Sequence, residues 1–428
     1  MYGKDTAVQQ VYTLDNAAKL FPAVASRSNT SVFRIAAIMK EWVDASALQK
    51  ATDNALKRYP FFAVGFRQGL FWNYMKSNSR RLLVQQESQY PCASMHHDDN
   101  EGFFLRVLYF GNRIAVEFFH SLTDGFGGIE FLKTLLFEYL RECGEALPDD
   151  GTVRLPGQKI PACETEDSFA KHLNPLVEPN KTKPGNAYRV RGTPYEHFGH
   201  GIIHGVYDAA QLARLAKQRQ MTLTQLFCAS LAYAVAQSPN KEDCPEPVVL
   251  SVPVNLRSFF PSGSLRNFFC ITNINIPGEG GERSFDETAA EIRKEFDEKV
   301  KKDYLESVIK ENHNVLAHPL VRFAPLFLKH AGTKFVFAKW AEKNKTATVS
   351  NLGVITMPEA MEKYVERMET VIYPTPGSPL NCCICSAAGK LTVSFSSSIR
   401  EKDIIRCFFM TIAKELGLCA ELYSNEWS

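Results

Sequence analysis

The chain has 428 residues, of which 45% are hydrophobic and 22% charged, close to ordinary globular usage. Its 49 Lys and Arg residues nearly balance 47 Asp and Glu residues. The resulting net charge of +2 gives no support to nucleic-acid binding, which needs a clustered basic face. At roughly 100–200 residues per domain, this length predicts two domains or one large two-lobed unit.

The N-terminal segment and the cysteines bear on the cellular compartment. The N-terminal residues hold no continuous apolar core of the kind that a signal peptide needs, and no run of about 18 apolar residues predicts a membrane span. The 11 cysteines are scattered over the chain rather than dense, as they would be in a small secreted domain. We therefore expect reduced thiols in a cytoplasmic protein.

Residues 1–160 are predicted to form the first lobe. Apolar residues at helical spacing predict a helix that ends before Pro60, and strands follow in FFAVGF and GLFWNYM. Gly111 and Asn112 then separate two β-rich runs, a tight-turn signal that predicts a hairpin over residues 103–120.

The segment EFFHSLTDGFGG joins this hairpin to an amphipathic helix predicted from the apolar spacing between Ile129 and Leu140. His120 ends the strand, and Asp124 and Gly125 lie in the short loop that follows. Such a strand end fixes a side chain while the loop leaves it reachable, which favours a catalytic histidine. The alternative is a partly buried core histidine beside an aspartate that caps the helix. The residues alone leave both interpretations open.

Residues 161–200 are rich in Pro and Gly and predict a long crossover linker. Residues 201–428 are predicted to form the second lobe, which carries VNLR and SNLG. Its predicted elements are, in chain order, a strand near 201–208, two helices within 209–238 with a cap at Thr222 or Thr224, strands within 247–260 and 267–276, a long helical region over 284–319, a strand over 346–355, two strands joined at 387–390 and a final helix over 401–418.

Two segments of the second lobe allow more than one interpretation. NCCICS (381–386) offers three sulfurs but no further Cys or His cluster at zinc spacing, so we expect strand residues and no metal site. The apolar, aromatic and basic stretch from His318 to Trp340 fits a membrane surface, an acyl channel or the core. Because amphipathic helices usually pack on a core, we favour the core.

HSLTDG matches the His-x-x-x-Asp-Gly signature of the chloramphenicol acetyltransferase-like superfamily, which the chain resembles. That group includes acetyl-CoA-dependent acyltransferases, alcohol acetyltransferases and the condensation domains of peptide synthetases. LQKATDNALKRYPFF is similar to the family's opening helix, and the stretch from Val252 to Phe269 and VSNLG from Val349 to Gly353 resemble segments of the alcohol acetyltransferase branch, all in the expected order. The resemblance spans most of the chain. It implies an α/β (α+β), two-lobed fold with pseudo-repeated lobes, mixed sheets and a central cleft or tunnel.

The same resemblance implies acyl transfer from acyl-CoA to a small hydroxyl or amine acceptor by direct attack in a ternary complex. His120 would be the general base. Asp124 would turn away from the substrate and pair with an arginine, for which Arg257 of VNLR is the candidate; the alternative for Arg257 is a solvated surface charge. Gly125 would let the backbone pass close to the neighbouring lobe.

The tetrahedral intermediate of acyl transfer bears an oxyanion that needs a hydrogen-bond donor. Ser350 and Asn351 of SNLG are candidates, with Thr272 and Asn273 behind them. Ser and Asn before Gly353 are equally well explained as turn-forming residues.

Two departures from the family's patterns favour a stand-alone acyltransferase. Phe119 precedes His120, where condensation domains usually carry a second histidine, and the sequence lacks the Asp-Phe-Gly-Trp-Gly motif of the plant acyltransferases. Two alternatives stay open: a donor carried on the phosphopantetheine arm of an acyl carrier protein, and a non-catalytic binding or regulatory protein on the same fold. Beyond acyl-CoA as cosubstrate, we expect no bound cofactor.

Overall fold

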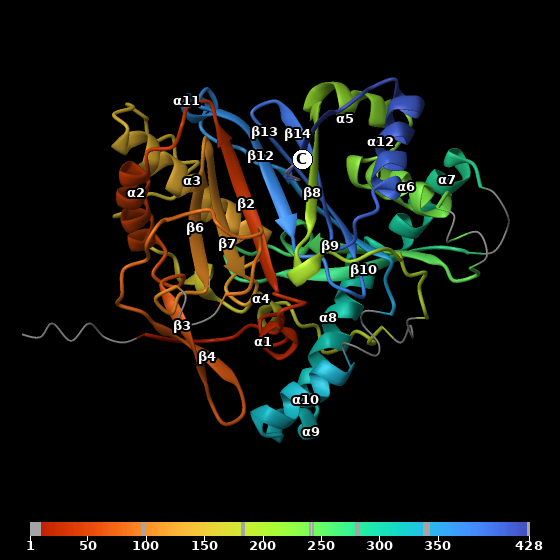
Figure 1. Ribbon diagram of the computed structural model, residues 1–428. Coiled ribbons are helices and arrows are strands. Elements are labelled where there is room, and N and C mark those ends of the chain that lie inside the picture. Colours follow the sequence, from red (N-terminus) through yellow and green to blue (C-terminus); the bar gives the residue numbers. More distant parts are fainter. Residues whose placement is uncertain are drawn as a thin grey trace, which may run out of the picture.

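The computed structural model describes residues 10–95, 100–180, 185–238, 241, 244–278, 283–336 and 343–425. Over these residues the chain forms two lobes that lie side by side, each built on a β-sheet with helices on its outer side (Figure 1). The main sheet of each lobe is mixed, since it combines parallel and antiparallel strand pairs. The predicted α/β, two-lobed architecture is therefore confirmed.

The first lobe contains a five-stranded sheet and a small three-stranded sheet. The predicted hairpin forms the middle of the larger sheet and turns at Gly111, whose φ of +58° suits glycine. The larger sheet has the order β12 (Val365–Ile372), β2 (Val32–Met39), β7 (Arg113–Phe119), β6 (Leu105–Phe110) and β5 (Gln85–Gln86). The smaller sheet has the order β1 (Val11–Thr13), β4 (Asn73–Ser77) and β3 (Val64–Gln68).

Two long helices cover the outer face of the five-stranded sheet. α2 (Ala45–Arg58) begins where Asp44 accepts hydrogen bonds from the amides of Ser46 and Ala47, and it packs against α3 (Gly125–Glu142). Because α3 lies between α2 and the sheet, most of its side chains are buried. Two short helices lie elsewhere in this part of the chain: α1 (Phe21–Val24) and, within the crossover, α4 (Ser168–Lys171).

The second lobe is built on a seven-stranded sheet in which β11 runs parallel to both neighbours. Its order is β10 (Phe269–Ile276), β9 (Val248–Asn255), β11 (Ala347–Val354), β13 (Leu380–Ala387), β14 (Lys390–Ser397), β8 (Gly201–Asp208) and β15 (Glu421–Ser424). The outer helices are α5 (Ala209–Gln218), α6 (Leu223–Ala236), α7 (Phe285–Lys299) and α12 (Asp403–Leu416). Thr222 and Gln225 form a capping box at the start of α6. α11 (Glu359–Glu362) is one short turn before β12.

One strand departs from the predicted lobe ranges. β12 belongs by sequence to 201–428, yet it pairs antiparallel with β2 at the edge of the first lobe's sheet. Its other side packs against β13 and β14, so the chain leaves the second lobe for one strand and then returns. Where the lobes meet, Ser396 donates a hydrogen bond to the carbonyl of Ile372 at 2.7 Å.

The interface between the sheets carries buried charges as well as apolar side chains. Arg34 lies in register with Glu117 and contacts it at 3.4 Å, while two short hydrogen bonds join its guanidinium to Glu87. Across the lobes, the imidazole of His204 lies 3.4 Å from the carboxylate of Glu369. These pairs satisfy the polar groups that the contact between the lobes removes from water.

The long helical region divides into α8 (Lys302–Ala317), α9 (Pro319–Phe323) and α10 (Leu326–Val336) after α7 ends. Our expectation that the stretch beginning at His318 packs on the core is wrong. Leu320, Phe323 and Phe327 are 80%, 66% and 70% exposed, because α9 and α10 project from the lower end of the molecule in Figure 1. Residues 337–340 of that stretch lie outside the described residues. Among the described residues, no helix is long and apolar enough to span a membrane.

Candidate active site

His120 follows the last residue of β7, and its backbone amide donates to the carbonyl of Ser31 at 2.8 Å. The loop between β7 and α3 is buried and anchored at two points. Ser121 donates to the carbonyl of Ala18 at 2.9 Å, and Thr123 donates to the carbonyl of Leu265 at 2.6 Å. The position of the imidazole is therefore set by a strand end and by contacts with segments distant in sequence.

Aromatic rings surround the imidazole of His120. Phe21 of α1 stacks on it with 4.4 Å between ring centroids, Phe33 lies at 4.9 Å and Phe269 at 5.3 Å. Burial among these rings lowers the pKa of His120 below its usual 6.5, because desolvation penalises the imidazolium. The ring is accordingly neutral near pH 7 and able to accept a proton.

A hydrogen-bond chain fixes the tautomer of that neutral ring. The amide nitrogen of Asn267 donates to the carboxylate of Asp15 at 3.3 Å, so its amide oxygen faces His120 Nδ1 at 3.1 Å. An amide oxygen only accepts, so Nδ1 carries the hydrogen and the lone pair is on Nε2. Burial raises the pKa of Asp15 to about 6, although the nearby Arg266 guanidinium opposes this shift.

The sequence analysis did not find Asn267 or Asp15. Asn267 lies within the stretch that resembles the alcohol acetyltransferases, which is the only signal that marks it. Asp15 lies in TLDNAAKL, which carries no pattern. Their role follows from the three-dimensional arrangement alone.

Asp124 and Arg257 meet at the start of α3. Arg257 Nη1 lies 2.7 Å from Asp124 Oδ2, which also accepts from the amide of Phe268 at 2.8 Å. Oδ1 of Asp124 accepts from the amide of Gly127 and so caps the helix. Both side chains of the pair are only 7% exposed, and the carboxylate lies on the α3 side of the loop, engaged with these partners. The guanidinium of Arg257 also donates to the carbonyl of Ser264 at 3.0 and 2.8 Å, which ties the loop to the second lobe.

Close packing at the start of α3 requires small residues. A Cβ on Gly125 would lie 2.4 Å from the side-chain tip of Leu352, which brings the SNLG segment of β11 against this loop. A Cβ on Gly127 would lie 2.2 Å from the carbonyl oxygen of Leu265, a backbone atom that cannot move aside. Gly127, which the sequence analysis did not single out, is therefore the more restricted position.

The four candidate oxyanion donors lie on β10 and β11. Asn351 donates to Thr224 at 2.9 Å and accepts from the amide of Gly353 at 2.8 Å, which holds the bulge at the end of β11. Ser350 is half-buried and in register with Cys383 of β13. None of the described hydrogen bonds joins a candidate donor to His120.

Thr272 and Asn273 point to opposite faces of β10, as successive strand residues do. Thr272 is buried, and its hydroxyl has no hydrogen-bond partner among the described residues. Asn273 accepts from Ser251 at 2.8 Å and alternates onto the same face as Phe269, the ring beside His120. The structure thus joins Asp124, Gly125 and Arg257 to the His120 loop, whereas the hydrogen bonds described for Asn351 and Asn273 go to residues other than His120.

The described residues contain no group of three or more His, Cys, Asp or Glu side chains that could hold a metal ion. Cys382, Cys383 and Cys385 lie buried in β13, where burial raises the pKa of each thiol, that of Cys383 to about 12. These thiols stay protonated and behave as apolar core residues.

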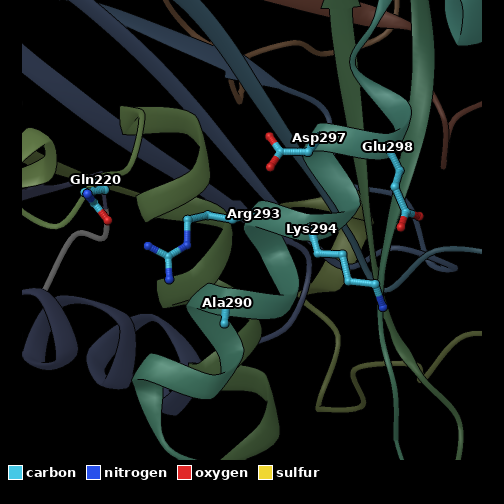
Figure 2. Close-up of a pocket in the computed structure, with 6 residues that line it drawn as sticks. All are labelled: Gln220, Ala290, Arg293, Lys294, Asp297 and Glu298. Carbon is cyan, nitrogen blue, oxygen red and sulfur yellow. The ribbon is translucent and has the colours of Figure 1, made fainter.

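Two surface hollows lie away from the His120 loop. One of about 600 Å³ is formed by α7 and Gln220, and Figure 2 shows its charged side chains projecting in different directions rather than converging on one point. The other, of about 410 Å³, lies on the outer side of α2 and α3. Neither is the central tunnel implied by the resemblance, so that tunnel stays a prediction.

No protein-family model matches the sequence, and no curated protein matches it. Solved structures do match along nearly the whole chain. The trichothecene 15-O-acetyltransferase from Fusarium sporotrichioides superposes with a TM-score of 0.59 at 11% identity, over 97% of this chain and 96% of that one. Polyketide synthase associated protein 5 from Mycobacterium tuberculosis gives 0.58 at 15% identity, over 94% and 98%.

A third match is the starter condensation domain of rhizomide synthetase, solved in complex with C8-CoA and Leu-SNAC. It gives a TM-score of 0.56 at 11% identity, over 95% of this chain and 94% of that one. At such identities the likeness establishes the fold alone. The chain has the two-lobed chloramphenicol acetyltransferase-like fold shared by acetyltransferases and condensation domains, and its substrates have to be argued from its own residues.

Proposed function

We propose that this chain is an acyltransferase that moves an acetyl or longer acyl group from acyl-CoA to a hydroxyl or amine acceptor. One observation carries the proposal: His120 is a neutral imidazole whose Nδ1 hydrogen is held by Asn267, so the lone pair that can accept a proton lies on Nε2. The fold shared with a 15-O-acetyltransferase supports the reaction class. The similarity of VNLR and SNLG to the alcohol acetyltransferase branch supports an alcohol as the acceptor.

The reaction proceeds by direct attack in a ternary complex. An alcohol is far less acidic than imidazolium, so His120 Nε2 takes the acceptor's proton as its oxygen attacks the thioester carbonyl carbon. The tetrahedral intermediate collapses with cleavage of the C–S bond. The imidazolium then returns the proton to the departing thiolate, so the products are an ester, or an amide from an amine, and free CoA. The thioester is already activated, and no acyl-enzyme is needed.

Asp124 and Arg257 have an indirect role in this mechanism and do not contact the reacting groups. Both are committed to each other and to backbone groups, so they position the loop that carries His120. Asn267 is a positioning residue as well, because it selects the tautomer. Ser350, Asn351, Thr272 and Asn273 are kept as proposed oxyanion donors, of which Asn351 and Asn273 are engaged in other hydrogen bonds. We place the reaction in the cytoplasm, supported by 11 cysteines that are all free thiols.

The test is the acceptor-dependent release of free thiol from acetyl-CoA and longer acyl-CoAs, with pooled alcohols and amines. We expect His120→Ala to lower turnover by roughly 10²–10⁴-fold without loss of folding, since that is the usual contribution of a general base. The matched control is His200→Ala, because His200 is also a buried histidine packed between aromatic rings, those of Tyr90 and Tyr373. Asn267→Ala should lower kcat more than it changes KM, and it should reshape the pH profile.

Two other outcomes would replace this proposal. Turnover only with an acylated carrier protein would establish the phosphopantetheine alternative. Ligand binding that His120→Ala leaves intact, with no turnover from either donor, would establish a non-catalytic binding protein.

A further inference from the structure

Exposed apolar side chains gather on α9, α10 and the neighbouring turn between β3 and β4, elements that lie at the lower end of the molecule in Figure 1. We call this surface the basic apolar patch. Its exposed apolar members, each more than 40% exposed, are Leu70, Phe71, Val315, Leu320, Phe323, Phe327 and Leu328. Large exposed clusters of this kind mark interaction surfaces, whereas single exposed apolar side chains do not.

The two parts of the basic apolar patch are joined by specific contacts. The amide of Leu326 donates to the carbonyl of Leu70 at 2.9 Å. Lys329 Nζ donates to the carbonyl of Phe71 at 2.7 Å and sits 3.4 Å from the centroid of the Trp72 ring. These bonds hold the β3–β4 turn against the start of α10, so the exposed side chains of both belong to one surface.

The segments that carry every apolar member except Val315 hold cations and no carboxylate, whereas α8, which carries Val315, also holds Asp303, Glu306 and Glu311. The sequence from residue 318 to 336 contains Arg322, Lys329 and Lys334 but no Asp or Glu, and the sequence from 64 to 77 likewise contains no Asp or Glu. Arg322 and Lys334 are exposed on the same short helices as the apolar side chains. Segments 318–336 and 64–77, which combine apolar side chains with cations and lack carboxylates, complement an anionic partner with an apolar interior.

We propose that the basic apolar patch docks this protein onto a membrane surface that contains anionic lipids. Phe323, Phe327 and Leu320 would enter the boundary between headgroups and acyl chains, and the cations would face the phosphates. A second copy of the chain fits less well, because a two-fold contact would bring two patches that both carry Arg322 and Lys334 together, and their like charges repel. α10, at 11 residues, is roughly 16 Å long, half of what crossing the hydrocarbon core requires, so the contact is peripheral.

The helix α1 links the basic apolar patch to the His120 site. α10 packs against α1, and α1 carries Phe21, the ring that stacks on His120. In a docked molecule, the side of the His120 loop that contacts α1 would therefore face the lipid. The docking itself does not depend on the proposed acyl transfer, because it rests on the exposed side chains and their charge.

The experiment is flotation of the full chain with vesicles of phosphatidylcholine alone and of phosphatidylcholine mixed with phosphatidylserine. We expect binding to the mixed vesicles that weakens as salt is raised, and little binding to phosphatidylcholine alone. Arg322→Gln with Lys334→Gln should weaken the vesicle Kd by about fivefold per cation removed. Leu320→Ser with Phe323→Ser and Phe327→Ser should weaken it by more than about tenfold.

The matched control is Leu176→Ser with Met410→Ser, which removes two exposed apolar side chains outside the patch. Its binding should equal that of the wild type. Equal loss in this control, equal binding to neutral vesicles, or absence of the wild type from the floating fraction would overturn the proposal. A wild-type dimer in solution that the patch variants convert to monomer would overturn it too, because the surface would then belong to a second copy.

Discussion

The pair of Asp124 and Arg257 makes the most direct prediction. Asp124→Asn leaves the Arg257 guanidinium buried among carbonyls without its anion, and Arg257→Gln leaves the Asp124 carboxylate buried without its cation. Because both side chains are only 7% exposed, water screens either orphaned charge poorly. Each single substitution should therefore lower the free energy of unfolding by about 3–5 kcal/mol.

The double substitution removes both charges at once. Its cost should fall short of the sum of the two singles by about 2 kcal/mol, within the range of coupling seen for residues in contact. Urea unfolding followed by far-UV circular dichroism measures all three variants, and kcat/KM for acyl transfer should fall in parallel. The solvent-accessible pair of Arg81 and Asp53 is the matched control, with an expected coupling much smaller than that of Asp124 and Arg257 because water screens its charges. Additivity at Asp124 and Arg257 within about 0.5 kcal/mol would refute the idea that this pair holds the loop.

Two more predictions concern the same loop. Because only the neutral imidazole accepts a proton, kcat/KM should fall as the pH drops through the lowered pKa of His120, with an acid limb below 6.5; a limb above that value in a pH–rate profile would contradict the role of burial. Gly127→Ala should lower the thermal midpoint far more than Gly125→Ala, since the new methyl group would meet the backbone of Leu265 in one case and a movable leucine side chain in the other; the reverse order in a melting experiment would count against the packing described.

Elements with strong local signals were predictable from the sequence. The β6–β7 hairpin has a Gly-Asn turn between β-rich runs, and the cap at Thr222 is a short-range pattern. The two strands joined near Gly389 are likewise adjacent along the chain. In each case the residues that determine the element lie within a few positions of one another.

Elements that depend on distant partners were not predictable in this way. β2, VFRIAAIM, is buried along its whole length, so it shows no alternation that would mark a strand. Its partner β12 comes from near the other end of the chain. The stretch beginning at His318 was assigned to the core because amphipathic helices usually pack there, and only the arrangement of α9 and α10 shows that its apolar side chains face outward.

In the candidate site, too, some residues were predictable from the sequence and others were not. His120, Asp124 and Gly125 are readable as a motif, and the resemblance suggested Arg257. Asn267 reaches His120, and Asp15 reaches Asn267, only because the fold brings an N-terminal loop and the segment before β10 to the same place. A single sequence carries no local pattern for such a relay.

The excursion of β12 into the first lobe has a consequence for biosynthesis. Until the ribosome has made residues 365–372, β2 pairs only with β7, and the backbone groups along its other edge remain open. Most of the second lobe is synthesised in the meantime, a delay on the order of tens of seconds. A nascent chain in that interval presents an apolar strand edge and invites chaperone binding. A ribosome stalled before β12 should therefore hold a first lobe that proteases still cleave, and one stalled well after it should not.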